Sequence, residues 1–383
     1  MAKPSHIITV LVTCLAISTS STPGGTRSRP PNAPREWPCP EATEISPCEC
    51  YADELYNLLM DCSAVENDSQ LADAFQAIFP FNDFYELKID QTDNANSALA
   101  AISRYTFGEI YFERILIKNT KVNLIDEEAL TLSYLTLELL DISNNMLAAY
   151  PFEALSNYQV LETFIIDGNL FVDLPPINSQ SLRILSANRI DNLTFGESVF
   201  SMAPNLESIS MNHINLQGVM PQTLFSSLQG IKNIDLSSNA VTELDVDSIN
   251  PTDMTITSLD LSSNAITYVR ANAINGLNST CTLNFANNEL IDLSEEEWRP
   301  VFDQVSGGSR NIDLSNNPLR CGCEIAWIIL DENQSYLPLI TENTNCNGGE
   351  QLISLDPIFF ETQCNTAKMM QQPRVTQPMN SET

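Results

Sequence analysis

The sequence predicts an α/β solenoid in which short parallel strands stack side by side, and three observations support this prediction. One pattern runs from Ile231 to Val241 and recurs from Ile256 to Ile266 in the chain of 383 residues. Both copies fit L-x-x-L-x-L-x-x-N-x-L, the signature of a leucine-rich repeat. Weaker copies recur about 25 residues apart, and a cluster of four cysteines lies on each side of them.

Each position that the repeat pattern specifies has a physical role. The apolar positions 1, 4, 6 and 11 point into the core, and the Leu-x-Leu segment forms a strand that pairs with the next coil. The asparagine at position 9 turns inward, where its amide can bond backbone groups that would otherwise be buried unpaired. A single coil cannot bury its apolar edge, so the coils must stack, and we expect a horseshoe with a parallel sheet on its concave side.

Ten frames of this pattern fill residues 84–320. Their first positions are Phe84, Phe112, Leu137, Leu161, Leu182, Leu206, Ile231, Ile256, Thr280 and Ser309. Six frames place asparagine at position 9: Asn145, Asn169, Asn239, Asn264, Asn288 and Asn317. The other four have Thr92, Thr120, Ile190 and Ile214 there, and we expect those coils to be less regular.

The composition excludes some classes of partner. The formal net charge is −31, with 49 acidic and 18 basic residues, while 43% of the residues are hydrophobic. Nucleic-acid binding needs basic groups that displace counterions from phosphates, and anionic membranes repel acidic proteins. The acidity is consistent with a soluble exposed surface. The alternative is recognition of a basic partner.

The two ends of the chain predict export. Residues 1–20 resemble a signal peptide, with Lys3 before the apolar run Ile7–Ile17 and small residues after it. That apolar run has about half the length that a bilayer span needs, and no other apolar stretch of the sequence approaches the length of a span. Residues 21–38 read as a Pro- and Arg-rich linker, and residues 365–383 as a polar, disordered tail. We therefore predict a secreted, extracellular protein without a membrane span.

The first cysteine cluster lies in residues 39–83 and consists of Cys39, Cys48, Cys50 and Cys62. Four cysteines allow three disulfide pairings, and the C-x-C spacing also admits a zinc site, although no histidine lies nearby. The spacing resembles the N-terminal cap of extracellular leucine-rich-repeat proteins. That resemblance implies pairing of the first cysteine with the third and of the second with the fourth.

The second cluster fills residues 321–364, directly after the frame that ends in Asn317-Pro-Leu319, and consists of Cys321, Cys323, Cys346 and Cys364. This join resembles the C-terminal flanking domain of the same class of proteins. The resemblance implies the pairs Cys321–Cys346 and Cys323–Cys364. Caps cover the apolar ends of a solenoid, and each disulfide typically contributes about 2–4 kcal/mol.

Two further features concern modification and redox chemistry. Glycosylation sequons occur at Asn67, Asn192, Asn278 and Asn333. Cys281 lies outside both clusters, at the second position of its frame. We expect it to be an inert, half-buried thiol; the alternative is an intermolecular disulfide.

Catalytic and metal-binding patterns are lacking in the sequence. The mature chain retains one histidine, His213, and it has no H-E-x-x-H, G-x-S-x-G, Walker or dinucleotide motif. Aspartates recur at position 5 of four frames: Asp141, Asp235, Asp260 and Asp313. A column of solvated aspartates explains them more simply than a calcium site. We predict no cofactor, no metal and no enzymatic activity of the chain by itself.

A protein-binding patch is predicted on the concave face. Positions 3 and 5 of each frame should point outward, and apolar residues at position 5 occur only in the N-terminal half, at Leu116 and Ile165. Leu139 and Ile184 at position 3 extend this set. Exposed apolar groups on one face often mark interfaces. The alternative is that irregular coils shift register and bury these residues.

The first half of the chain also resembles one particular family. The runs that carry the resemblance are Met60-Asp-Cys62-Ser-Ala-Val, Ile78-Phe-Pro80-Phe-Asn-Asp-Phe84, Phe112-Glu-Arg-Ile115, Tyr150-Pro-Phe152-Glu-Ala-Leu155 and Leu174-Pro-Pro-Ile-Asn-Ser-Gln-Ser-Leu182. They are similar to secreted arthropod proteins of the kind that includes the non-catalytic, leucine-rich-repeat subunit of a deep-sea shrimp luciferase. The resemblance covers about residues 39–364. It implies a secreted glycoprotein that accompanies a smaller catalytic subunit and performs no chemistry.

The sequence therefore favours a secreted binding module, with the non-catalytic subunit of a bioluminescence complex as its sharpest form. Two alternatives of other classes stay open: an innate-immune protein that recognises microbial ligands, and a component of the extracellular matrix or of cell adhesion. An enzyme is the least favoured reading.

Overall fold

The computed structural model describes residues 38–371 except 95, 197 and 223, with side chains up to residue 364. The predicted signal peptide (1–20) and all but the last residue of the predicted linker (21–38) lie outside these residues, as do residues 372–383 of the predicted tail. The described residues belong to one compact unit that begins at Glu36.

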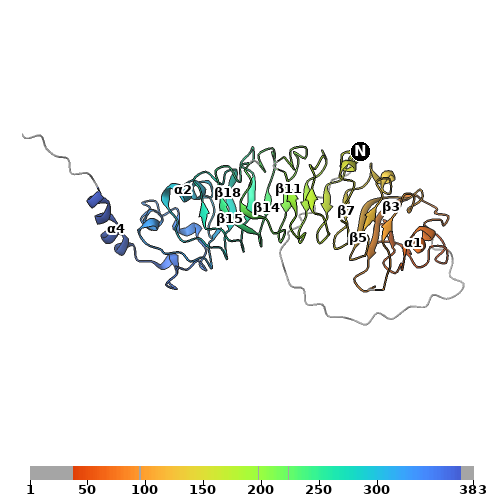
Figure 1. Cartoon of the computed structure of the whole chain (residues 1–383), viewed down its shortest axis with the longest axis horizontal. Coiled ribbons are helices and arrows are strands. Elements are labelled where there is room, and N and C mark those ends of the chain that lie inside the picture. Colours follow the sequence, from red (N-terminus) through yellow and green to blue (C-terminus); the bar gives the residue numbers. More distant parts are fainter. Residues whose placement is uncertain (1–37, 95, 197, 223, 372–383) are drawn as a thin grey trace, which may run out of the picture. The chain divides into compact units, whose positions relative to one another are not determined.

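A parallel sheet runs along this unit, and Figure 1 shows its strands succeeding one another in chain order from the N-terminal cap to the C-terminal cap. Within the described residues it has 12 strands, and only β1 and β2 pair in antiparallel fashion. The strands are β1 (Glu49–Ala52), β2 (Leu58–Asp61), β3 (Asp83–Asp90), β5 (Tyr111–Lys118), β7 (Leu139–Asp141), β8 (Thr163–Ile165), β10 (Ile184–Ser186), β12 (Ser208–Ser210), β14 (Asn233–Asp235), β16 (Ile256–Asp260), β18 (Leu277–Asn284) and β19 (Ile312–Asp313). The predicted fold class is thereby confirmed.

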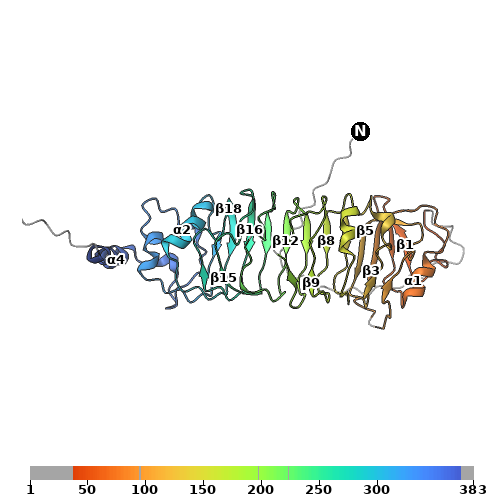
Figure 2. The same ribbon diagram turned by 45° about the horizontal axis from the view of Figure 1, so that its top comes forward.

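The return segments of the coils form smaller elements. Figure 2 shows β9 and β15 on the opposite side of the coils from β8, β12 and β16. The short sheets pair β4 (Ala101–Ile102) with β6 (Leu124–Ile125), β9 (Asp173–Leu174) with β11 (Thr194–Phe195), and β13 (Gln217–Val219) with β15 (Ala240–Leu244) and β17 (Tyr268–Val269). The helices are α1 (Asp68–Ala74), η1 (Thr131–Ser133), η2 (Phe152–Asn157), α2 (Glu295–Gln304), η3 (Cys323–Ile325), α3 (Ala326–Ile329), η4 (Leu337–Leu339), η5 (Leu352–Ser354) and α4 (Pro357–Gln371).

The pairing register of the main sheet follows the predicted frames. Position 4 of each frame lies opposite position 4 of the next, as Leu140 lies opposite Phe164 and Ile234 opposite Leu259. These side chains are buried, because successive residues of a strand point to opposite faces of the sheet. Positions 3 and 5 therefore form two outward rows, and we call the surface that they cover the open face of the sheet.

Inward asparagines join each coil to the coil before it. The amide of Asn288, 4% exposed, donates from Nδ2 to the carbonyls of Leu261 and Phe285, and its Oδ1 accepts the N–H of Ile266. Asn145, Asn169, Asn239, Asn264 and Asn317 make equivalent bonds. These amides satisfy backbone groups that each inward turn buries, as the pattern predicts.

The coils without this asparagine keep their register through other contacts. Ile190 and Ile214 are fully buried and bring no polar group to position 9. Across the same coils a chain of side-chain bonds runs along the outside of the turn: Asn188 donates to Asp167 and accepts from Ser210, which also donates to Asp235. The expected loss of regularity is therefore compensated by surface hydrogen bonds.

The last two frames depart from the prediction at their first positions. Thr280 and Ser309 were placed inward, yet both are exposed. The register between β16 and β18 shifts after Ile256, so that Leu277 pairs with Ile256 and Cys281 fills the interior with 0% exposure. Asn311 is also buried and donates to the carbonyl of Cys281. Cys281 is thus fully buried, not half-buried, because the extra residues of β18 bulge.

Both ends of the sheet carry disulfide caps. The bonds are Cys39–Cys50, Cys48–Cys62, Cys321–Cys346 and Cys323–Cys364, the pairs that the resemblance to extracellular caps implies. The N-terminal cap contributes β1 and β2 to the main sheet itself. At the other end α4 continues to Gln371, so the predicted disordered tail, placed from residue 365, begins at least seven residues too early.

Substituting Asn288 should test how much the inward asparagines stabilise the coils. Asn288→Ala leaves the N–H of Ile266 and two carbonyls buried without their partner, so we expect a loss of about 2–3 kcal/mol in the free energy of unfolding. Urea unfolding monitored by circular dichroism measures it. Asn233→Ala, on the exposed side of β14, is the matched control and should change stability by less than about 0.5 kcal/mol.

Candidate functional site

The four apolar residues predicted to form a patch lie on four neighbouring strands of the open face. Leu116 lies on β5, Leu139 on β7, Ile165 on β8 and Ile184 on β10. Each is half-buried. They alternate with core residues along the strands, so they point away from the core. The register is not shifted here, and the structure therefore leaves all four side chains on the outer surface.

Polar side chains separate these apolar residues. Row 5 reads Leu116, Asp141, Ile165, and row 3 reads Arg114, Leu139, Thr163, Ile184 across the strands. Directly opposite residues in neighbouring strands lie about 4.8 Å apart, so Leu139 and Ile165 meet diagonally around Asp141. Asp141 is only 8% exposed, and its Oδ1 accepts the N–H of Ser143. The patch is an apolar surface with one partly covered carboxylate inside it.

The structure extends this surface into the N-terminal cap, which the sequence reasoning missed. Tyr51 lies opposite Leu59, and Leu59 lies opposite Glu86, so both belong to row 3 of the open face. Tyr51 is 45% exposed. Nearby carboxylates contribute to a raised Tyr51 pKa, although burial is the larger cause. The alternation of buried and half-buried residues in Leu58–Asp61 is typical of a strand with one outward face, but this strand lies before the first repeat frame.

Two ion pairs lie between the cap residues and the patch. Arg114 Nε lies 3.1 Å from Glu86 Oε2, and Lys88 Nζ lies 3.0 Å from Asp61 Oδ2. Both pairs join neighbouring strands, and all four side chains are partly exposed, so each pair stabilises the fold only modestly. They form a charged band that divides the apolar residues of the open face into two groups.

The C-terminal half of the open face is polar and internally bonded. Asp235 accepts hydrogen bonds from the N–H and hydroxyl of Ser237 and from the hydroxyl of Ser210. Asp260 likewise accepts the N–H of Ser262, and Asp313 that of Ser315. The aspartates of this column therefore cap strand ends; Asp141 is buried, whereas Asp235, Asp260 and Asp313 are half-buried and stay partly solvated. No group of three metal-binding side chains occurs among the described residues.

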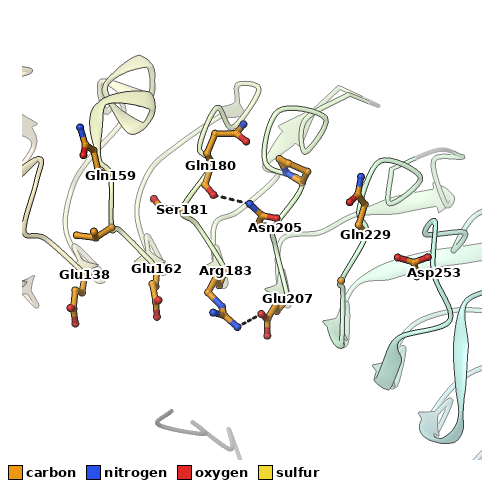
Figure 3. A pocket seen from close by; sticks show the side chains of 13 residues that line it. Glu138, Gln159, Glu162, Gln180, Ser181, Arg183, Asn205, Glu207, Gln229 and Asp253 are labelled. Carbon is orange, nitrogen blue, oxygen red and sulfur yellow. Dashed lines mark hydrogen bonds and ion pairs between the residues drawn. The ribbon is translucent and has the colours of Figure 1, made fainter. Parts of the chain in front are cut away.

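A shallow groove follows the edge of the sheet where β7, β8, β10 and β12 begin. Figure 3 shows the side chains of Glu138, Glu162, Arg183 and Glu207 in a line below the amides of Gln159, Gln180, Asn205 and Gln229. Arg183 and Lys232 pair with Glu207. Glu138 and Glu162 are exposed and have no basic partner among the described residues. The edge beside the patch therefore presents two free carboxylates.

His213 is bonded to no acidic or nucleophilic side chain among the described residues. His213 is exposed in the turn that follows its strand, with φ at 53°, and its Nδ1 lies 3.2 Å from Oδ1 of Asn212.

No helix in the described part of the chain has the length and apolar character that a bilayer crossing requires.

The four sequon asparagines differ in exposure. Asn67, Asn192 and Asn333 are exposed, whereas Asn278 is half-buried and its Oδ1 accepts hydrogen bonds from Thr280.

Sequence comparison assigns the chain to a family. It is 31% identical over 329 residues to the non-catalytic subunit of Oplophorus-luciferin 2-monooxygenase from Oplophorus gracilirostris, covering 85% of this chain and 88% of that protein. The chain belongs to the family of this luciferase subunit. The resemblance read from the sequence is thereby confirmed. Because the relative is a non-catalytic subunit, the prediction that the chain is not itself an enzyme is confirmed as well.

One solved structure with a TM-score above 0.5 supports the fold. A chain in the octameric complex of Latrophilin 3, Unc5D and the leucine-rich-repeat part of FLRT2 matches with a TM-score of 0.59 and 19% identity, covering 76% of this chain and 86% of that one. Human 5T4, a trophoblast glycoprotein, matches with a TM-score of 0.44 and 13% identity over 85% and 98% of the two chains. No protein-family model matches the chain.

Cys281, which forms no disulfide bond, should be unreactive in the folded protein. Burial raises the pKa of the Cys281 thiol to about 12, so the nucleophilic thiolate is scarce at neutral pH. We expect no labelling of Cys281 by iodoacetamide at pH 8 in the folded protein and complete labelling in denaturant, measured by peptide mass spectrometry. Rapid labelling of the folded protein would show that the residue is accessible.

Proposed function

We propose that this chain is a secreted, non-catalytic subunit that binds a separate catalytic subunit of a luciferin-oxidising complex through the open face of its sheet. The observation that carries the proposal is the apolar patch of Leu116, Leu139, Ile165 and Ile184 on a face whose other half is polar. Family membership supports the role, since the Oplophorus relative is named as the non-catalytic subunit of a luciferin monooxygenase.

The physical division of the open face supports the choice of this patch. In the C-terminal half, Asp235 and Asp260 are occupied by bonds to their own turns and neighbours. In the N-terminal half, the apolar residues face solvent, and covering them with a partner would be favourable by about 25 cal/mol per Å² of buried apolar surface. The exposed carboxylates of Glu138 and Glu162 beside the patch favour a partner that brings basic or N–H groups.

Secretion is part of the proposal. The apolar run Ile7–Ile17 near the N-terminus has the length of a signal-peptide core, and four disulfides of this kind persist in oxidising compartments. The sequon residues Asn67, Asn192, Asn278 and Asn333 lie outside rows 3 and 5 of the sheet. Glycans at these sites would therefore leave the patch uncovered.

Cross-linking in the extracellular fluid of the source organism, followed by mass spectrometry, tests which partner the chain meets. We expect a small catalytic subunit of the monooxygenase type. Recovery of microbial surface material would instead favour the immune alternative, and recovery of matrix proteins the adhesion alternative. No specific contact in the structure favours either alternative.

Introducing charge into the patch should abolish partner binding. Leu116→Asp with Ile165→Asp places two carboxylates where apolar contact is needed, so we expect the Kd for the cross-linked partner to rise about 30-fold or more. Isothermal calorimetry with purified proteins measures it.

The matched control is Asn233→Asp with Thr282→Asp, which adds the same charge to row 3 of the polar half, on strands that do not border the patch. That double variant should bind as the unmodified chain does. Thermal unfolding of both variants must show folded protein. Unchanged binding by the patch variant would refute the assignment of this surface.

Glycan mapping should follow the exposure of the sequons. Asn67, Asn192 and Asn333 are exposed, whereas Asn278 is half-buried. We expect high occupancy at the first three sites and the lowest at Asn278 in protein secreted by insect cells. Enzymatic deglycosylation in ¹⁸O-labelled water with peptide mass spectrometry measures it, and full occupancy at Asn278 alone would contradict this order.

A further inference from the structure

The turn between β1 and β2 holds two large apolar side chains in water. Leu55 is 80% exposed and Tyr56 is 89% exposed, the latter the most exposed large hydrophobic side chain among the described residues. Tyr56 makes no ring contact with another described residue. Turn positions are normally taken by glycine, asparagine or aspartate, which lose little by being solvated. Two apolar residues at this place therefore need an explanation outside the requirements of the turn.

The turn is rigid. The carboxylate of Asp53 accepts the N–H groups of Leu55 at 2.8 Å and of Asn57 at 2.9 Å, and also the Nδ2 of Asn57 at 2.9 Å. Backbone bonds join Asp53 to Asn57 and Tyr56 to Asp53, each at 3.0 Å. The bond from Asn57 keeps the pKa of Asp53 below its usual value, so the carboxylate stays charged and the bracing persists at mildly acidic pH.

Tyr56 is also held in a conformation that tyrosine rarely adopts. Its φ is 65°, in the left-handed region where a side chain crowds the backbone. Here the hydrogen bonds to Asp53 impose the conformation. A solvent-exposed glycine or asparagine would satisfy the same turn without that cost. The sequence thus keeps a strained aromatic residue at the tip of a braced loop.

The position of the turn links it to the patch. Since β2 runs parallel to β3, β5, β7 and β8, the turn before β2 lies at the edge where these strands begin. This is also the edge that carries Glu138 and Glu162. From β1 to β10 there are six strand intervals, or about 29 Å at 4.8 Å each. A standard interface of about 800 Å² per partner has about the same width as this distance from β1 to β10.

We propose that the β1–β2 turn is a second contact point for the same protein that covers the patch, and that this protein receives Leu55 and Tyr56 in an apolar pocket bordered by basic side chains. The inference rests on the proposed function and specifies the partner's chemistry. Basic groups are expected because the exposed Glu54 directly precedes the two apolar residues and Glu49 begins the same hairpin. The same acidity makes an anionic membrane an unfavourable occupant.

Site-specific photo-cross-linking of the full chain tests the proposal. Benzoylphenylalanine replaces Tyr56, Ile165 or Tyr105 in three separate variants, which are irradiated in the extracellular fluid of the source organism. Tyr105 is the matched control: it has the same φ of 65°, is 69% exposed, and lies on the return side of its coil after β4. We expect one and the same protein to be cross-linked from positions 56 and 165, and not from position 105.

Binding of that purified partner then separates contact from folding. Tyr56→Gly should weaken the Kd at least tenfold, whereas Tyr105→Gly should leave it unchanged. Both glycines adopt a positive φ without strain, which offsets the greater entropy that glycine gives the unfolded chain. Tyr105→Gly also loses the contact of its ring with the Arg104 guanidinium at 4.6 Å, and the Tm of each variant measures any effect on folding. A loss of binding by Tyr56→Gly at unchanged or raised Tm supports a direct contact.

The remaining outcomes overturn the inference in distinguishable ways. A partner cross-linked from position 165 but not from 56, or unchanged binding by Tyr56→Gly, overturns the turn contact and leaves the proposed function standing. No cross-link from either position overturns both. Co-sedimentation of the unmodified chain, but not of Tyr56→Gly, with vesicles of phosphatidylcholine and phosphatidylserine would show that the turn contacts lipid and would overturn the inference.

Discussion

The structure depends on the need to bond backbone groups wherever a coil turns inward. Asn288 shows the solution: one amide reaches two carbonyls and one N–H, and two of these three groups belong to the preceding coil. Because every such amide joins two coils, no coil is complete without its neighbour. The two terminal coils lack a neighbour on one side, and the disulfide-bonded caps cover them.

The way each coil meets this need also shapes the open face. Where Ile190 and Ile214 replace the inward asparagine, neighbouring coils are held together from outside by hydrogen bonds from Asn188 to Asp167 and from the hydroxyl of Ser210 to Asn188 and Asp235. Their polar groups are therefore engaged within the chain. In the coils before them, the apolar side chains of Leu116, Leu139 and Ile165 stand in rows 3 and 5 and take no part in side-chain hydrogen bonds. The surface available to a partner is thus the surface that the coils do not use for their own cohesion.

Periodicity made most of the open face predictable. A repeat with apolar residues at fixed intervals defines which side chains point inward, so Leu116, Leu139, Ile165 and Ile184 could be assigned outward from their numbers alone. The outward positions of Tyr51 and Leu59 could not be predicted from the repeat, because these residues belong to an antiparallel hairpin that precedes the first frame. The aspartates of position 5 were placed correctly, but their burial and their bonds to the following turn were not foreseen.

The sequence by itself determined the solenoid, the register of its strands and the outward rows, because these follow from local spacing that is repeated along the chain. Only the tertiary structure decided the side-chain partnerships, since those join residues about one coil apart whose distances no local pattern encodes. It also decided that Thr280 and Ser309 lie outside and Cys281 inside, because β18 accommodates extra residues by bulging. The exposure of Tyr56 at positive φ is of the same kind, because hydrogen bonds to Asp53 impose it.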